Sequence, residues 1–249
     1  MLKGLWKLTW LEIKIFLREP LGVIGSIVIP AVLFLALGRI VTSRPVRFSN
    51  RLTDFVMVGL PVFVSVMIAI STALSLVTIM AIYREGGILK RLRATPLRPH
   101  TILAAHVMVK LFMTLVTLAI VMAVGARYYP VTVDARFVSF AGALLFSTLS
   151  ILGMGFLIAS LAPSGRFAQP LGSLILYPMI GLSGLFVPVE EMPDAMQRIA
   201  SALPLTYAVS LLRGAWLGDA WSLHMGDIGV LTVVFIACSA LSARLFRWQ

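Results

Sequence analysis

Few residues of this sequence have the types and spacing that catalysis needs. Ser183 lies in the run GLSG (residues 181–184), and His224 opens the run HMGDIG. A serine and a histidine held close together can form a nucleophile–base dyad, because the imidazole takes the proton of the attacking hydroxyl. Small residues such as Gly181, Ser183 and Gly184 also let apolar helices approach one another closely. We favour the packing interpretation and keep a Ser183–His224 dyad as the alternative.

Metal coordination and paired-carboxylate chemistry are poorly supported by the remaining candidates. The spacing of His100 and His106 is not that of two ligands on one helix face. Glu190 and Glu191 are adjacent and lie near an expected helix start, where carboxylates are usually solvated. The single cysteine, Cys238, excludes an internal disulfide and a cysteine-based metal cluster. We therefore predict no catalytic residue, no metal site and no cofactor bound by this chain.

The run REGGILKRLRATPLRPH (residues 84–100) is suited to contact rather than to catalysis. Gly86 and Gly87 permit a sharp turn, and Pro96 ends any helix that follows because it disfavours helical backbone before it. Three apolar residues can share one face of a short helix between these points: Ile88, Leu89 and Leu92. Three basic residues would lie on its other faces: Lys90, Arg91 and Arg93. Periodicity alone leaves two interpretations open, a solvated loop that sets membrane topology and a helix that docks on a partner.

The segments that position these residues are strongly apolar. Of the 249 residues, 59% are hydrophobic and only 12% are charged, whereas a soluble domain carries about 25% charged residues. Roughly 20 consecutive apolar residues suffice to cross a bilayer as a helix. Six stretches qualify: 21–39, 55–82, 101–125, 137–161, 168–188 and 224–245. We therefore predict an all-α integral membrane protein with one transmembrane domain, residues 1–249.

Charge patterning indicates a membrane partner and an orientation. The net charge is +11, and the basic residues cluster beside apolar stretches, where they orient the chain and contact anionic headgroups. We expect contact with membrane lipids and not with nucleic acid. Residues 1–20 read as an amphipathic helix in the membrane interface. An even number of spans places both termini on one side, and the Lys/Arg bias predicts that this side is the cytoplasm, although the Arg-rich first external loop opposes the assignment.

The long segment 189–223 reads as two short external helices separated by Pro204. Apolar residues recur at helical spacing in the first part: Met192, Met196, Ile199 and Leu203. They recur again in the second part: Tyr207, Leu211 and Leu212. Apolar faces at this place favour re-entrant helices that dip back toward the bilayer.

Two of these runs carry a resemblance to a known family. REGGILKRLRATPL resembles the first cytoplasmic loop of type-2 ATP-binding-cassette (ABC) export permeases, where an E-x-G-x-L-x-x-L-x-x-x-P-like run forms the coupling helix. The matching residues are Glu85, Gly87, Leu89, Leu92 and Pro96. The run GLSGLFVPVEEMPDAMQRIASALPLTYAVSLLRG (181–214) resembles the end of the family's fifth span and its re-entrant external helices. With the N-terminal interfacial helix and six spans, the resemblance covers nearly the whole chain.

The resemblance implies a permease subunit that works with other chains. The permease would pair with a second copy of itself or a homologous permease in a bacterial plasma (inner) membrane. Cytoplasmic ATPase subunits would bind ATP and Mg and move the coupling helix, here Glu85, Gly86, Gly87, Ile88, Leu89, Lys90, Arg91, Leu92, Arg93 and Pro96. The sequence contains no Gly-Lys dipeptide, which a phosphate-binding P-loop requires. We therefore expect a separate ATPase chain.

The family's second and fifth spans line the substrate route, which points to candidate path residues. In residues 55–82 they are Ser65, Thr72 and Ser75, and near residues 168–188 they are Tyr177, Ser183 and Phe186. The hydroxyls serve close helix packing equally well. A route with few charges suits export of a hydrophobic or amphipathic molecule such as a drug, lipid or secondary metabolite, hence multidrug efflux. A polysaccharide or glycan permease is the alternative. A rhomboid-like intramembrane serine protease, which GLSG also resembles, is the remote one.

One lysine lies inside an expected span. Lys110 is expected to snorkel toward the cytoplasm, with a buried ion pair as the alternative. No acidic residue lies deep in any expected span. This argues against a proton- or cation-coupled antiporter.

Overall fold

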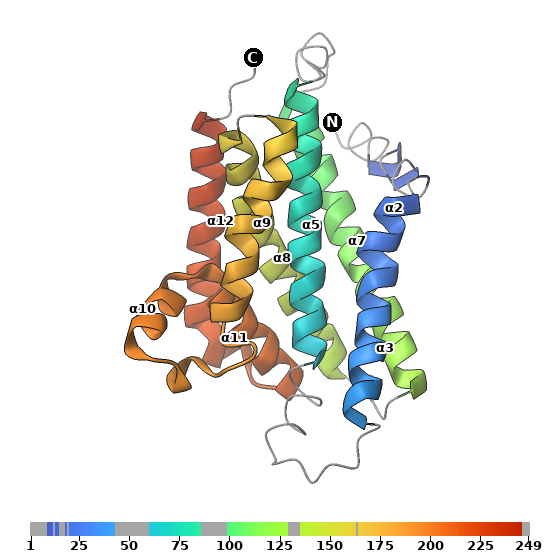
Figure 1. Cartoon of the computed structure of the whole chain (residues 1–249), viewed down its shortest axis with the longest axis vertical. Helices are drawn as coiled ribbons and strands as arrows, with labels where there is room; N and C mark the ends of the chain where they lie inside the picture. Colours follow the sequence, from blue (N-terminus) through green and yellow to red (C-terminus); the bar gives the residue numbers. More distant parts are fainter. Residues whose placement is uncertain are drawn as a thin grey trace.

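The computed structural model describes residues 9–11, 13, 14, 18, 20–42, 60–85, 99–128, 135–162 and 164–245. Within them the chain forms helices and no strand (Figure 1). The first helical run comprises α2 (Pro20–Val23), the π-helical η1 (Ile24–Val28) and α3 (Ile29–Thr42). The long helices are α5 (Leu60–Glu85), α7 (Pro99–Tyr128), α8 (Ala135–Leu161), α9 (Gly165–Leu182) and α12 (Met225–Leu245). Shorter elements precede α12: η3 (Val189–Glu191), α10 (Asp194–Ala202), α11 (Pro204–Leu217) and η4 (Trp221–His224).

The helices are long because hydrocarbon offers no hydrogen-bond partner to the backbone, so each span must satisfy its own N–H and C=O groups. Helices α5, α7 and α8 have 26, 30 and 27 residues, which at about 1.5 Å per residue exceeds a hydrocarbon core of about 30 Å. Four described helices are long and apolar enough to cross a membrane: Pro61–Tyr83, Ala104–Val124, Phe137–Leu161 and Trp221–Leu245. The chain is thus a multi-pass membrane protein.

The other two expected spans differ from their predicted extents. The apolar part of the first helical run, Ile24–Ala36, is shorter than the four long helices. Helix α9 ends at Leu182, before the predicted end at 188, and a turn follows in which Gly184 has a φ of 78°. Glycine tolerates this backbone conformation, which ends a helix. The count of six spans therefore stays a prediction.

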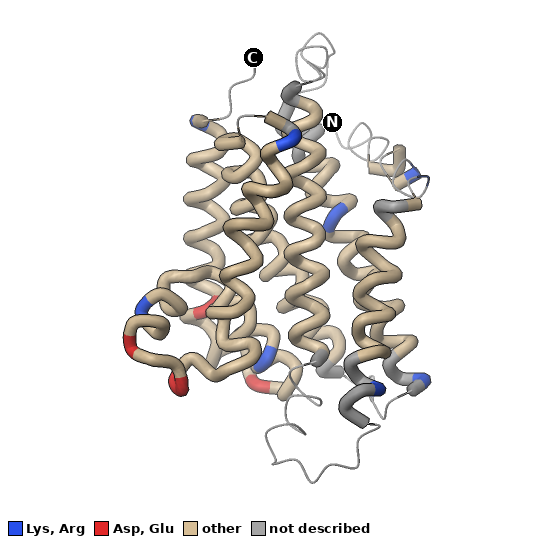
Figure 2. Tube along the Cα trace, viewed as in Figure 1, with Lys and Arg blue, Asp and Glu red and all other residues tan. Residues whose placement is uncertain are grey.

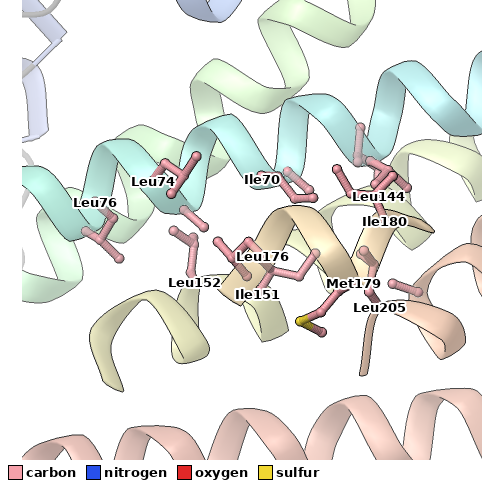
Figure 3. Close-up of a cluster of buried hydrophobic side chains, with 14 of the residues drawn as sticks. Ile70, Leu74, Leu76, Leu144, Ile151, Leu152, Leu176, Met179, Ile180 and Leu205 are labelled. Atoms are coloured by element: carbon pink, nitrogen blue, oxygen red, sulfur yellow. The ribbon is translucent and has the colours of Figure 1, made fainter. Parts of the chain in front are cut away.

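Helix α5 lies at the centre of the bundle and forms the core with α8, α9 and α11. Figure 3 shows the side chains that meet there: Ile70, Leu74 and Leu76 of α5, Leu144, Ile151 and Leu152 of α8, Leu176, Met179 and Ile180 of α9, and Leu205 of α11. Within the apolar part of α5, 67% of residues are buried, against 11% in α12. Both helices are strongly apolar, so α5 is a protein-facing helix, whereas most of the apolar surface of α12 lies outside the bundle of this chain.

The two ends of the bundle differ. Helix α2 begins and α12 ends at one end, here called the termini end, while α10 and α11 lie at the other, the α11 end (Figure 1). The described acidic side chains gather at the α11 end (Figure 2). They are Glu190, Glu191, Asp194, Asp219 and Asp227.

Helices α10 and α11 have different surroundings. Pro204 lies at the start of α11 and separates it from α10, because proline is favoured in the first helical turn. Helix α11 packs into the bundle against α8 and α12, with seven buried residues: Leu205, Ala208, Val209, Leu211, Leu212, Gly214 and Ala215. Helix α10 instead leaves Met196 and Ile199 exposed. It is α11, and not α10, that returns into the bundle.

Candidate substrate path

The three α5 hydroxyls of the predicted path face the interior of the chain. Ser65 and Thr72 are buried, and the Oγ1 atoms of Thr72 and Thr114 of α7 are 3.4 Å apart. Ser75 Oγ accepts a hydrogen bond from Lys110 Nζ at 2.6 Å. Ser65 Oγ is buried without a hydrogen-bond partner among the described residues. Thr72 and Ser75 thus join α5 to α7 rather than line an opening in this chain.

The predicted path residues near the end of α9 have different positions. Tyr177 and Phe186 are 53% and 52% exposed, and the Phe186 ring lies 5.6 Å from that of Phe63 on α5. Ser183 is buried, and its hydroxyl donates to the Ile180 carbonyl at 2.8 Å. The structure therefore does not bring the six candidates together. The two aromatics face outward, where lipid or another chain can reach them.

Prolines and a cation shape the end of α9. Pro170 and Pro178 lie inside the helix, and neither has an N–H to donate to the preceding turn. Beyond Ser183, the carbonyl of Gly184 accepts a hydrogen bond from Arg213 Nη2 of α11 at 3.1 Å. Arg213 thereby fixes the turn after α9 to α11.

A cavity of about 370 Å³ opens beside this turn at the α11 end, here called the mouth cavity. It lies between the α9 turn, η3, α11 and the start of α12. Its polar lining residues are Ser183, Glu190, Ser201, Thr206, Tyr207, Ser210, Arg213, Asp219, His224 and Asp227. Thr206 and Tyr207 donate to the carbonyls of Ala200 and Ser201, both at 2.7 Å. The hydroxyl oxygens retain lone pairs that can accept from a ligand.

His224 is held by carboxylates beside the mouth cavity. Its Nδ1 lies 2.9 Å from Asp227 Oδ2, which also accepts the Ser210 hydroxyl at 2.8 Å. Its Nε2 lies 3.5 Å from Asp219 Oδ2. Ser183 lines the same cavity, but its hydroxyl is directed to a backbone carbonyl and the His224 Nδ1 to a carboxylate. This geometry favours the packing interpretation of Ser183 over a nucleophile–base dyad.

A buried polar row on α7 escaped the sequence analysis. His106, Lys110 and Thr114 recur every four residues and are buried, as is Thr117. Residues at this spacing share one helix face, so polar side chains repeating in an apolar helix were the available signal. Lys110 is only 6% exposed and donates to Ser75. The expectation that Lys110 snorkels is therefore wrong, because a hydroxyl of α5 meets its ammonium inside the bundle.

Comparison with known proteins decides the family. A family model described as ABC-2 type transporter matches residues 3–217, from the N-terminus through α11. This chain belongs to the ABC-2 type transporter family. The resemblance drawn from residues 84–97 and 181–214 is thereby confirmed.

Individual ABC-2 relatives differ in how much they share with the chain. It is 24% identical to the daunorubicin resistance ABC transporter permease protein DrrB1 of Streptomyces coeruleorubidus over 242 residues, which is 96% of this chain and 84% of that protein. It is 33% identical to nodulation protein J of Rhizobium leguminosarum bv. viciae over 99 residues, covering 40% of this chain and 38% of that protein. The probable multidrug ABC transporter permease YbhR of Escherichia coli is 26% identical over 165 residues, 45% of its length.

Helix α5 ends and α7 begins at the termini end, on either side of the predicted ATPase-coupling segment of this ABC-2 chain (Figure 1). Glu85 is the last residue of α5 and Pro99 the first of α7. The other coupling candidates, Gly86 to Arg93 and Pro96, lie outside the described residues. Residues 86–98 therefore connect α5 to α7, the two helices that the Ser75–Lys110 and Thr72–Thr114 contacts join.

Proposed function

We propose that this chain is the membrane subunit of an ATP-driven exporter and forms its substrate path. The observation that carries the proposal is the family match over residues 3–217. It is supported by similarity along 96% of the chain to a protein named as an ABC transporter permease. ATP and Mg would bind to a separate cytoplasmic ATPase chain. A P-loop needs a Gly-Lys dipeptide to hold phosphate, and this sequence contains none.

The termini end of the bundle would face the cytoplasm of a bacterial cell, across the plasma (inner) membrane. Helix α5 ends and α7 begins at that end, and the sequence between them, residues 86–98, includes Lys90, Arg91, Arg93 and Arg98. Short loops rich in Lys and Arg stay on the cytoplasmic side. The α11 end would then be external, and the mouth cavity would open toward the outside.

Residues 85–93 with Pro96 would form the coupling helix. Its apolar residues Ile88, Leu89 and Leu92 would seat in a groove of the ATPase, while its basic residues face acidic partner groups or lipid headgroups. A movement of the ATPase would thus reach the membrane through the ends of α5 and α7.

A second copy of this chain, or a homologous permease, would pair along α9. Several large apolar side chains on and after α9 are exposed in the single chain: Phe167, Leu174, Tyr177, Phe186 and Val187. Pairing at this face would place the aromatic residues Tyr177 and Phe186 between the two copies. A path between copies would then be lined by α9, with α5 directly behind it.

The substrate would be hydrophobic or amphipathic, such as a drug, lipid or secondary metabolite. Few charges lie along α5 and α9. A highly charged molecule would therefore find few side chains of opposite charge to pair with on entering the path. Two relatives, a daunorubicin resistance permease and a probable multidrug permease, favour a drug-like molecule. A glycan-containing molecule is the second candidate, because hydroxyl side chains line the mouth cavity.

Reconstitution tests the proposal. The chain and its cognate ATPase are placed together in proteoliposomes, and ATP-dependent movement of daunorubicin, as an amphipathic probe, is compared with that of a soluble oligosaccharide. We expect a stable complex, ATP hydrolysis that requires the ATPase chain, and movement of the amphipathic probe. ATP hydrolysis by the isolated chain would contradict the assignment of that activity to a separate ATPase chain. Movement of the oligosaccharide alone would select the glycan alternative.

A further inference from the structure

Helices α5 and α7 meet along a row of polar and aromatic contacts, here called the polar seam. It consists of three pairs: Thr72 with Thr114, Ser75 with Lys110, and Tyr83 with His106. The hydroxyls of the first pair are 3.4 Å apart, and Lys110 Nζ donates to Ser75 Oγ at 2.6 Å. In the third pair the two rings meet edge-on with centroids 5.3 Å apart. Polar side chains thus join the helices at three successive levels.

The order of the pairs shows how the seam is built. The α5 members advance from Thr72 to Tyr83 while their α7 partners step back from Thr114 to His106, as two antiparallel helices require. On α7 the partners lie four residues apart and so share one face. Tyr83 is close to the end of α5, and the seam therefore runs from the interior to the α5–α7 connection, residues 86–98.

The seam matters because α5 and α7 otherwise contact each other over a small area. Helix α5 packs much more extensively on α8 and α9 than on α7. Apolar contacts alone hold two spans weakly in register, since lipid tails are as apolar as the side chains. Removing a hydrogen-bond acceptor from a buried ammonium is disfavoured in such surroundings. The Ser75–Lys110 contact therefore selects one register of α5 against α7.

The seam also reaches the first helical run. Thr117, on the same helix as Lys110, donates to the Ser26 carbonyl at 3.2 Å. Ser26 lies in η1, a π-helical turn, and such turns offer carbonyls outside the regular α-helical pattern. Polar contacts on α7 consequently extend from His106 to Thr117, which reaches η1.

We propose that the polar seam makes α5 and α7 one rigid unit that carries ATPase movement into the membrane, with Lys110 as its central positioning residue. The inference rests on the proposed function. A displacement applied to residues 86–98 would move α5 and α7 together, and α5 would transmit it to α9, against which it packs. Without the seam, the two helices would slip past one another, and ATP would be hydrolysed with less substrate moved.

The first test compares transport per ATP hydrolysed in proteoliposomes holding the chain and its ATPase. Lys110→Met and Ser75→Ala each remove one partner, and we expect transport per ATP to fall about tenfold with ATP hydrolysis retained. Ser75→Thr keeps a hydroxyl and should restore coupling. Thr78→Ala is the matched control, because the Thr78 hydroxyl donates to Leu74 of its own helix at 3.0 Å and does not join the seam.

A cross-link provides the second test. In a Cys238→Ala background, which removes the single native cysteine, Thr72→Cys and Thr114→Cys are combined with Lys110→Met. Oxidation should join the two new thiols, whose positions are those of hydroxyls 3.4 Å apart, and should restore transport per ATP. Reduction should abolish it again. If Lys110 only stabilised its local surroundings, a disulfide between positions 72 and 114 would not restore transport per ATP.

The outcomes separate the seam from the function on which it rests. If wild-type protein with its ATPase moves no substrate, the proposed function fails. If the wild type transports but Lys110→Met and Ser75→Ala match Thr78→Ala, the seam proposal alone is overturned. It is also overturned if the oxidised cross-link leaves Lys110→Met uncoupled. Should Lys110→Met fail to assemble, the Ser75→Ala and Ser75→Thr pair decides.

Discussion

At the scale of single residues, Gly214 on α11 lets a histidine lie directly against the helix backbone. A Cβ at Gly214 would overlap the His224 imidazole ring. His224 in turn contacts Asp227, which accepts the Ser210 hydroxyl of α11. Because Gly214 has no side chain, His224 fits between α11 and the start of α12 and contacts Asp227 beside the mouth cavity. Close approach of this kind is a reason for glycine inside a helix.

Gly214→Ala should therefore destabilise the protein. The added methyl group displaces the imidazole from Asp227, and overpacking of this kind costs about 1–3 kcal/mol. The midpoint of thermal unfolding in detergent is the measurement, and it should fall. Gly229→Ala in α12 is the control, because no atom lies within 4 Å of a Cβ built there. Equal midpoints for the two variants would contradict the tight fit of His224.

Ser183 offers a second prediction at this scale. Its hydroxyl is buried and donates to the Ile180 carbonyl, so it is expected to support the end of α9 and not to act as a nucleophile. Ser183→Ala should leave transport largely intact, and wild-type protein should resist labelling by a fluorophosphonate. Stoichiometric labelling of Ser183 that is lost in a His224→Ala variant would reverse this assignment.

At the scale of elements, similar apolar helices have different tasks. Helix α5 is mostly buried and directs the hydroxyls of Thr72 and Ser75 at α7, whereas α9 contains two prolines and exposes aromatic residues. In the sequence, the proposed coupling segment follows α5 directly, because α5 ends at Glu85. Movement imposed on that segment must therefore pass first through α5 and α7.

Variants in the coupling segment should separate ATP hydrolysis from export. Buried apolar side chains contribute about 1.5–3 kcal/mol each, whereas exposed charges contribute about 1 kcal/mol or less. Leu89→Asp and Leu92→Asp should therefore stop export while the permease still folds and inserts, and Arg91→Ala should have a mild effect. Export by cells is the measurement. Normal export by both aspartate variants would leave residues 84–100 as a basic loop that only sets topology.

At the scale of the whole molecule, burial separates lipid-facing from protein-facing helices. Helix α12 is apolar yet presents most of its surface outward, including Val233 and Ile236. Helix α9 also has outward apolar residues, among them Leu174, which is 72% exposed. Both α9 and α12 thus offer apolar faces to their surroundings, and the proposed pairing uses the α9 face.

Cysteine cross-linking distinguishes the two faces. In the Cys238→Ala background, Leu174→Cys or Tyr177→Cys should give covalent dimers in membranes on mild oxidation, because these positions would lie near the axis between two copies. Val233→Cys on α12 is the matched control and should stay monomeric on a denaturing gel. Dimers formed through Val233→Cys and not through Leu174→Cys would place the interface on α12.

The sequence by itself determined the class of protein and the positions of its long helices. Apolar length identifies spans because hydrocarbon forces each backbone to satisfy its own N–H and C=O groups, and Pro204 marked the break between α10 and α11 because proline is favoured in the first turn of a helix. Only the tertiary structure decided which faces meet. Lys110 reaches Ser75 instead of the headgroups, His224 contacts Asp227 instead of Ser183, and Tyr177 and Phe186 face outward while Thr72 faces α7. The physical reason is that lipid and protein interiors are equally apolar, so hydropathy along the chain carries no information about which neighbour a side chain has.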